Sequence, residues 1–155
     1  MTADRHDAAV AGPTGDRRTL ALAQVRPIGA ADVPRAAAFL RAQLKPELPQ
    51  EIWERSFRLS SAGDHPNAGF MLVDGDEVVG AYSATYAERR FDGRVERICG
   101  LGHWAVLPAY RRFSLSLLRA ILSQPGYSFT DFLPTPSVAT LNERLGFRTL
   151  ETSMS

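Results

Sequence analysis

Hydrophobic and polar residues alternate along several stretches of this chain, and this period of two predicts β-strands. The predicted strands cover residues 20–28, 69–74, 77–88, 95–106, 127–133 and 147–153. Asp74-Gly75 separates the second strand from the third and predicts a tight hairpin turn, and a further turn is expected at 89–93. Gly100 and Gly102 interrupt the fourth strand, which indicates a bulge or a place where another group, such as a ligand, approaches the backbone.

Apolar residues recur with the helical period of 3.6 in four other stretches. The first predicted helix follows Asp32, a residue type that caps helix N-termini, and the second covers residues 49–59. The third follows the strand that ends at Val106, and the fourth ends at Gly146, which suits a helix C-terminus. The residues expected to share a face in these helices are Val33, Ala37, Leu40 and Leu44; Ile52, Ser56 and Leu59, flanked by Trp53 and Phe57; Leu115, Leu118 and Leu122, with Leu117 and Ile121 beside them; and Val138, Leu141 and Leu145.

The elements follow the order strand, two helices, three strands, helix, strand, helix, strand, which predicts an α/β (α+β) fold. A chain of 155 residues suits one domain, which we expect over residues 20–155. Residues 1–19 mix Ala, Gly, Asp and Arg without periodicity, so we expect them to form a mobile tail.

The charge balance narrows the classes of partner. Because 18 Lys and Arg nearly balance 17 Asp and Glu, the chain lacks the strong positive field that general nucleic-acid or membrane-surface binding uses. No apolar run reaches membrane-spanning length, the single cysteine cannot form an internal disulfide, and the N-terminus lacks an apolar signal core. We therefore expect a cytoplasmic protein without a nucleic-acid or membrane partner. The histidines and the cysteine show no metal-ligand spacing, so no metal is expected.

A basic elbow at Tyr110, Arg111 and Arg112 joins the fourth strand to the third helix. Arg111 and Arg112 lie in this elbow, and the first turn of the helix follows. The first amide N–H groups of a helix have no intrahelical partner and lie at the positive end of the helix dipole. A helix start beside two arginines suits an anion, so the elbow is a candidate phosphate site.

The stretch from Val106 to Leu118 (VLPAYRRFSLSLL), with Leu145-Gly146-Phe147 near the end, resembles the GNAT superfamily of acyl-CoA-dependent N-acyltransferases. The resemblance covers residues 20–155. It implies a mixed, mostly antiparallel sheet that is flanked by helices on both faces and splayed between the fourth and fifth strands. It places the family's phosphate loop on Arg111, Arg112, Phe113, Ser114, Leu115 and Ser116. Two glycines of that loop are serine here, which a residue in helical geometry tolerates without strain.

The resemblance also implies a chemistry. An acyl group, with acetyl the expected one, would pass from acetyl-CoA or another acyl-CoA to an amine of a small molecule or peptide. Backbone groups of Ala105, Val106 and Leu107 would lie unpaired in the splay and bind the pantetheine arm, and an amide near Val106 would hold the oxyanion. His103 and Glu96 are the candidate bases that would deprotonate the acceptor.

Asn142 departs from the family, because many relatives carry at this position a tyrosine thought to protonate the departing thiolate. An amide cannot donate that proton, although a thiolate of pKa about 8.5 is a fair leaving group without help. Two alternatives stay open: a catalytically silent domain that binds acyl-CoA or a protein partner, and a transferase charged from an acyl-carrier protein. Cys99 is expected to pack in the core rather than act as a nucleophile. Trp53 and Trp104 could line an acyl or acceptor pocket, although aromatic residues at such spacings more often pack in the core.

The end of the sequence predicts an unpaired strand edge. Relatives follow the strand after Gly146-Phe147 with one more strand, whereas the present chain ends at residue 155. A strand without its partner exposes amide and carbonyl groups that recruit another chain. We therefore expect either a homodimer through residues 147–153 or a domain that belongs to a longer polypeptide.

Overall fold

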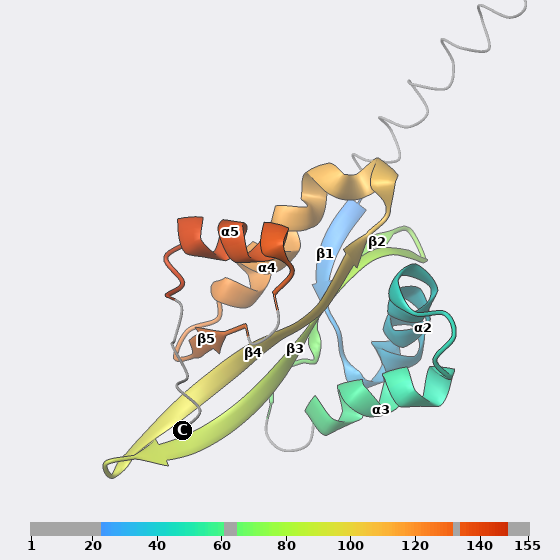
Figure 1. The fold of residues 1–155 in the computed structure, drawn as a ribbon. Helices are drawn as coiled ribbons and strands as arrows, with labels where there is room; N and C mark the ends of the chain where they lie inside the picture. Colours follow the sequence, from blue (N-terminus) through green and yellow to red (C-terminus); the bar gives the residue numbers. More distant parts are fainter. Residues whose placement is uncertain (1–22, 61–64, 132–133, 149–155) are drawn as a thin grey trace, which may run out of the picture.

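A five-stranded sheet runs through the part of the chain that the computed structural model describes, residues 23–60, 65–131 and 134–148 (Figure 1). Its strands, in spatial order, are β1 (Ala23–Pro27), β2 (Gly69–Asp74), β3 (Glu77–Phe91), β4 (Arg94–Val106) and β5 (Ser128–Thr130). Neighbours from β1 to β4 pair antiparallel, whereas β5 joins β4 in parallel. The sheet is therefore mixed and mostly antiparallel, as the resemblance implied.

Helices cover both faces of this sheet. The helices are α2 (Val33–Leu44), α3 (Gln50–Ser60), α4 (Ser114–Leu122) and α5 (Pro136–Arg144), with two short 3₁₀ helices, η1 (Ala30–Asp32) and η2 (Pro108–Phe113). In Figure 1, α2 and α3 lie on one side of the sheet, and α4 and α5 lie on the other. Two separate clusters of buried apolar residues, one on each side, hold these layers together.

The sheet splays between β4 and β5. Only residues 98–100 of β4 pair with β5, whereas β3 accompanies β4 from Arg94 to Val106. Beyond Gly100 the outer edge of β4 therefore has no strand beside it in the described part of the chain. The splay implied by the resemblance is confirmed, and it leaves one edge of β4 open to a ligand.

The buried face of α3 differs from the expected one. Trp53 is 3% exposed and Phe57 is 2% exposed, whereas Ile52 is 52% exposed. The two aromatic rings bury more apolar area than Ile52 and Ser56 would, so Trp53 and Phe57 face the core. The predicted face with Ile52 lies at the margin of the core.

The predicted faces of α4 and α5 are also displaced. Leu115 and Leu145 are exposed, because both lie in terminal turns where a helix has fewer neighbours. The buried residues of these two helices are Leu117, Leu118, Ile121 and Asn142. Gly146 has a φ of +91° and follows the last turn of α5, so the predicted helix end is confirmed.

Asp32 does not cap α2 as predicted. The short helix η1 precedes α2 and leaves Asp32 with helical backbone angles instead of an extended N-cap. Its carboxylate accepts a hydrogen bond from the Gly29 N–H at 3.1 Å and pairs with Arg35 at 3.0 Å. The aspartate therefore stabilises the start of η1, one turn earlier than expected.

The hairpin of β3 and β4 extends beyond the helices as a two-stranded ribbon (Figure 1). Strand β3 continues to Phe91, so the turn consists of Asp92 and Gly93, whose φ angles are 48° and 77°. Two central residues with positive φ form the tight turn that matches the twist of a hairpin. The predicted turn at 89–93 is therefore too wide, because its first residues belong to the strand.

Two predictions depend on residues outside the described ones. The tail, residues 1–19, is one of them. The other is the last strand at 147–153, of which residues 147 and 148 are described and lie outside any strand. The homodimer contact at this segment stays a prediction.

Candidate functional site

The elbow is the 3₁₀ helix η2, which runs directly into α4. Tyr110 is buried and donates a hydrogen bond of 2.5 Å from its hydroxyl to Asp74 Oδ2 at the end of β2. The backbone N–H of Tyr110 donates to the Leu107 carbonyl at 2.9 Å. These bonds join the elbow to the β2–β3 hairpin, so the start of α4 has a defined position on the sheet.

Arg111 and Arg112 are exposed on the elbow, and neither takes part in an ion pair within the described residues. Ser114 has helical backbone angles, φ −53° and ψ −46°, so serine fits the first loop position without strain. Its N–H already donates to the Arg111 carbonyl, however, and is not available to an anion. The elbow therefore offers two guanidinium groups but fewer free amides than a helix without a preceding 3₁₀ turn.

The backbone of β4 presents alternate residues to the splay. Leu107 donates its N–H to the Val79 carbonyl at 2.9 Å, and Ala105 lies opposite Ala81 in the same antiparallel ladder. Because the hydrogen-bonding direction alternates along such a ladder, Ala105 and Leu107 direct their backbone groups to β3, whereas Val106 directs its groups to the splay. The expectation that all three residues are unpaired is therefore wrong for Ala105 and Leu107.

Gly102 and His103 form a β-bulge opposite Ser83 of β3. A Cβ atom at Gly102 would lie 2.3 Å from Ser83 Oγ, and one at Gly100 would lie 2.6 Å from Thr85 Oγ1. The same Ser83 Oγ accepts a hydrogen bond from the His103 N–H at 2.8 Å. The groups that approach these two glycines are therefore side chains of β3.

A cavity of about 450 Å³ lies beside the splay. The end of α2, the helix α3, the bulged part of β4 and the start of α5 line it. Most of its wall is apolar, and its titratable side chains are Lys45, Tyr82, His103 and Asp131. A mostly apolar cavity of this size with a few polar groups is typical of a small-molecule site.

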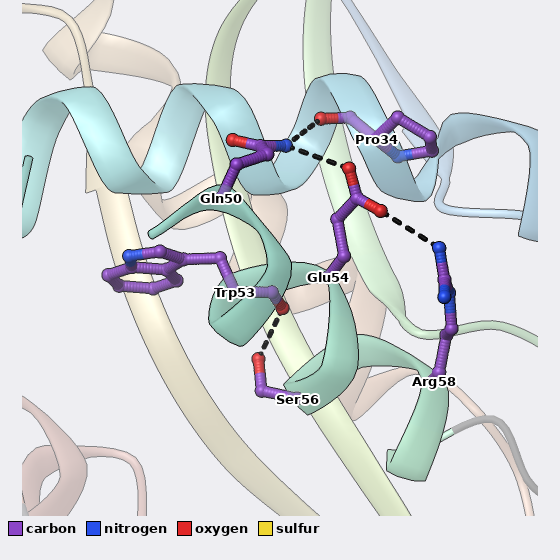
Figure 2. A network of polar contacts seen from close by, with 6 residues as sticks. All are labelled: Pro34, Gln50, Trp53, Glu54, Ser56 and Arg58. Carbon is purple, nitrogen blue, oxygen red and sulfur yellow. Dashed lines mark hydrogen bonds and ion pairs between the residues drawn. The ribbon is translucent and has the colours of Figure 1, made fainter. Parts of the chain in front are cut away.

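Helix α3 forms one wall of the cavity, and polar contacts near its start hold it in position (Figure 2). Gln50 Nε2 donates to the Pro34 carbonyl of α2 at 2.9 Å and to Glu54 Oε1 at 3.1 Å. Glu54 also pairs with Arg58 one turn later, at 2.8 Å. Figure 2 shows the Trp53 ring extending away from these contacts, and this ring lines the cavity.

His103 lines the cavity from β4. Its imidazole meets the Trp53 indole edge-on, with 4.9 Å between ring centroids and 65° between ring planes. The imidazole makes no hydrogen bond to another described residue, so its nitrogens are available to a ligand. Burial lowers the pKa of His103, and the positive charge of Lys45 lowers it further. The imidazole is therefore neutral near pH 7 and can accept a proton.

Asp131 follows β5 and lines the cavity together with the rings of Tyr82 and Trp104. Asn142 of α5 donates a hydrogen bond from Nδ2 to Asp131 Oδ2 at 2.8 Å. The Tyr82 and Trp104 rings stack with 4.6 Å between centroids and 5° between planes. Burial raises the pKa of Tyr82, and the negative charge of Asp131 raises it further, so the phenol stays protonated.

Glu96 and Cys99 are not among the residues that line the cavity. Glu96 is exposed on the ribbon opposite Arg89, and it lies roughly 20 Å from His103 for a strand rise of about 3.3 Å per residue. Cys99 is fully buried, as expected, and burial raises the pKa of its thiol to about 11. Of the two candidate bases, the structure brings His103 to the cavity and leaves Glu96 outside it.

Sequence reasoning missed Lys45, Tyr82 and Asp131 as cavity residues. A carboxylate directly after a strand is a signal that could have pointed to Asp131, since functional groups are frequent at strand ends. Lys45 and Tyr82 carried no comparable signal, because one follows an ordinary helix and the other lies in a strand with a core-like pattern. Trp53 is buried as expected but also lines the cavity, as Trp104 does.

Comparison with known proteins finds similarity in structure but not in sequence. No protein-family profile matches the chain, and no curated protein matches it either. The aminoglycoside N-acetyltransferase AAC(6')-Iy, solved with CoA, is similar with a TM-score of 0.63 at 18% identity, over 86% of this chain and 92% of that one. AAC(6')-Ih from Acinetobacter baumannii is similar with a TM-score of 0.60 at 18% identity, over 86% and 95% of the two chains.

A predicted acetyltransferase from Clostridium acetobutylicum, solved with acetyl-CoA, is similar with a TM-score of 0.64 at 11% identity, over 86% of this chain and 94% of that one. The chain has the GNAT fold. At these identities the GNAT proteins share with it the arrangement of the sheet and helices, so the chemistry must be argued from the cavity itself.

Two further observations concern membrane-spanning helices and metal-ligand groups. No helix within residues 23–60, 65–131 and 134–148 is long and apolar enough to cross a membrane. Within the same residues, no three His, Cys, Asp or Glu side chains gather in a group that could hold a metal ion.

Proposed function

We propose that this protein is an N-acyltransferase that moves an acyl group, with acetyl the expected one, from acyl-CoA to an amine. The observation that carries the proposal is the cavity of about 450 Å³ beside the splay, with the neutral imidazole of His103 in its wall. GNAT-fold structures that contain CoA or acetyl-CoA support a CoA thioester as the donor.

On the donor side, Arg111 and Arg112 bind the phosphates of CoA. Guanidinium groups make charge-assisted hydrogen bonds to phosphate oxygens, and these two are exposed without an ion-pair partner among the described residues. The hydroxyls of Ser114 and Ser116, in the first turn of α4, can donate to the same oxygens. The rest of the loop comprises Phe113 and Leu115.

Val106 connects the donor to the cavity. Its backbone groups face the splay, so they can bond the pantetheine arm as it passes along the open edge of β4. A backbone N–H at this edge also stabilises negative charge on the carbonyl oxygen during transfer. The thioester then lies next to His103, which is three residues earlier on the same strand.

The reaction is a direct transfer. The neutral amine nitrogen attacks the thioester carbonyl carbon, a C–N bond forms, and the C–S bond breaks as the CoA thiolate leaves. His103 takes the proton that the amine loses. Because Asn142 has no proton of suitable acidity, the thiolate, of pKa about 8.5, leaves without an acid at that position.

The acceptor is a small-molecule amine. The cavity has the size of a small-molecule site, and two of the structurally similar proteins are named for aminoglycoside acceptors. The base assignment rests on His103 and not on Glu96, because Glu96 lies on the exposed ribbon.

A two-stage experiment tests the function. Native mass spectrometry of the purified protein should show bound CoA or acyl-CoA, and incubation with acetyl-CoA and a panel of primary amines should release free thiol and an amide product of the expected mass. CoA binding without thiol release from any amine would favour the catalytically silent domain. Thiol release only from an acyl-carrier-protein thioester would replace CoA as the donor.

A further inference from the structure

One charged part of the cavity wall is the carboxylate of Asp131. Among the described residues that line the cavity, Asp131 is the one carboxylate, and no ion pair joins it to a described Lys or Arg. Its Oδ2 accepts the hydrogen bond from Asn142, whereas Oδ1 has no hydrogen-bond partner in the described part of the chain. Asp131 is half-buried, and charges at a partly buried site are screened less than charges on the open surface, so this oxygen suits a cation.

Asn142 orients this carboxylate without neutralising it. The amide is 5% exposed and comes from α5, so its 2.8 Å bond holds the Asp131 side chain against a buried group. A neutral donor fixes one carboxylate oxygen and leaves the full negative charge for a ligand. The result is a pre-positioned anionic group, which lowers the entropy cost of binding a cation.

Two aromatic rings lie near the carboxylate of Asp131. Tyr82 and Trp104 line the same cavity and stack nearly parallel, so each ring restricts the movement of the other. The charge of Asp131 raises the pKa of Tyr82, which indicates that the carboxylate and the phenol lie close together. Because the two rings face each other, no cation fits between them, and they form an apolar side of the cavity next to the carboxylate.

The other charged part of the cavity has the opposite character. Lys45 lines it near His103 and acts on the pKa of the imidazole. A positive charge there disfavours a second ammonium group but favours the neutral form of an amine, which is the nucleophilic form. The two parts therefore suit different amino groups of one molecule, one neutral at His103 and one protonated at Asp131.

We propose that the acceptor is a diamine or polyamine, whose reacting amino group lies at His103 while a second, protonated amino group binds the carboxylate of Asp131. This inference rests on the proposed function, because it names the class of acceptor for that reaction. The rest of the cavity wall is mostly apolar and suits the carbon chain that separates the amino groups.

Equilibrium binding tests the subsite without requiring turnover. Isothermal calorimetry would compare 1,4-diaminobutane, 1,6-diaminohexane and 1,8-diaminooctane with the monoamine of the same chain length, and with 6-aminohexanoate. The best diamine should bind about tenfold or more tightly than its monoamine, because it adds one ammonium–carboxylate contact in a partly buried site. Asp131→Asn should remove this difference, and Asp92→Asn, the same charge change at the ribbon tip, should keep it.

Asp131→Asn is expected to fold, since the new amide oxygen can accept the same hydrogen bond from Asn142. Equal affinity of every diamine and its monoamine in the wild-type protein would overturn the inference, and so would a diamine preference that survives in Asp131→Asn. Tighter binding of 6-aminohexanoate than of 1,6-diaminohexane would assign an amino acid instead. Acetyl transfer without a diamine preference would overturn the subsite alone, whereas a diamine preference without acetyl transfer would overturn the proposed function alone.

Discussion

The imidazole of His103 and the indole of Trp53 meet edge-on in the wall of the cavity, with 4.9 Å between their ring centroids. His103 comes from the bulged part of β4, and Trp53 comes from α3, which is bonded to α2 through Gln50 and Pro34. The candidate base is therefore positioned by a helix layer that is distant from it in sequence. Both sides of this contact can be tested by substitution.

Trp53→Ala should lower the free energy of unfolding by about 3 kcal/mol or more, because a large aromatic side chain, 3% exposed, leaves the core. Trp53→Phe should cost less, since phenylalanine keeps most of the apolar area and removes a buried indole N–H without a partner in the described part of the chain. Chemical denaturation measures both changes. Ile52→Ala, on the exposed side of the same helix, should change stability by less than about 0.5 kcal/mol. Equal losses at both positions would contradict the assigned buried face.

His103→Ala should reduce turnover by about 100-fold or more at neutral pH, because the attacking amine loses the group that accepts its proton. In the wild-type enzyme, kcat/KM should fall as the pH drops through the pKa of His103, since only the neutral imidazole accepts a proton. Burial and the charge of Lys45 lower this pKa, so the fall should occur below the ordinary histidine value of about 6.5. The pH–rate profile with an identified amine measures it.

The fall of kcat/KM at low pH is the acidic limb of the pH–rate profile. Lys45→Gln should move this limb to higher pH, because one of the two causes that lower the pKa of His103 is removed. His65→Ala is the matched control, since His65 stacks on Tyr86 and is not among the cavity residues. Its acidic limb should stay in place. An acidic limb that persists in His103→Ala would show that another group accepts the proton.

Changing Arg111 and Arg112 together to glutamine should weaken CoA binding about 100-fold, because each charge-assisted hydrogen bond contributes about 1.5–3 kcal/mol. Calorimetric titration with CoA measures the loss. The same double change at Arg89 and Arg90, two neighbouring arginines on the ribbon, removes equal charge far from the elbow and should leave the affinity nearly unchanged. Equal effects of the two double variants would show that CoA responds to net charge and not to the elbow.

Gly102→Ala should destabilise the protein by about 1–3 kcal/mol, because the new methyl group would lie 2.3 Å from Ser83 Oγ at the bulge. Thermal or chemical unfolding measures the change. Ser83→Ala in the same chain should recover part of the loss, since it removes the overlapping oxygen. Gly29→Ala has its nearest neighbour at 3.5 Å and should be tolerated. Full stability of Gly102→Ala would mean that the bulge adjusts without cost.

Local patterns along the chain are enough to predict the order of elements and most of their bounds. Alternation from Glu77 onward and the Asp74-Gly75 turn depend on residues that are neighbours in sequence, so β2 and β3 follow from them. The position of the elbow follows in the same way, because Pro108 ends the strand and an amphipathic stretch begins after it. These patterns therefore predict an α/β fold, and the GNAT fold was inferred from the resemblance of residues 106–118 and 145–147 to that superfamily.

The cavity was decided only by tertiary structure, because its chemistry depends on contacts between distant segments. Whether α3 buries Trp53 or Ile52 depends on what packs against the helix, and periodicity alone does not choose between adjacent faces. The bulge at His103 follows from Ser83 of β3, and it changes which side chains of β4 face α3. Asp131 is held in position by the hydrogen bond that it accepts from Asn142 of α5. No local sequence pattern predicts this bond.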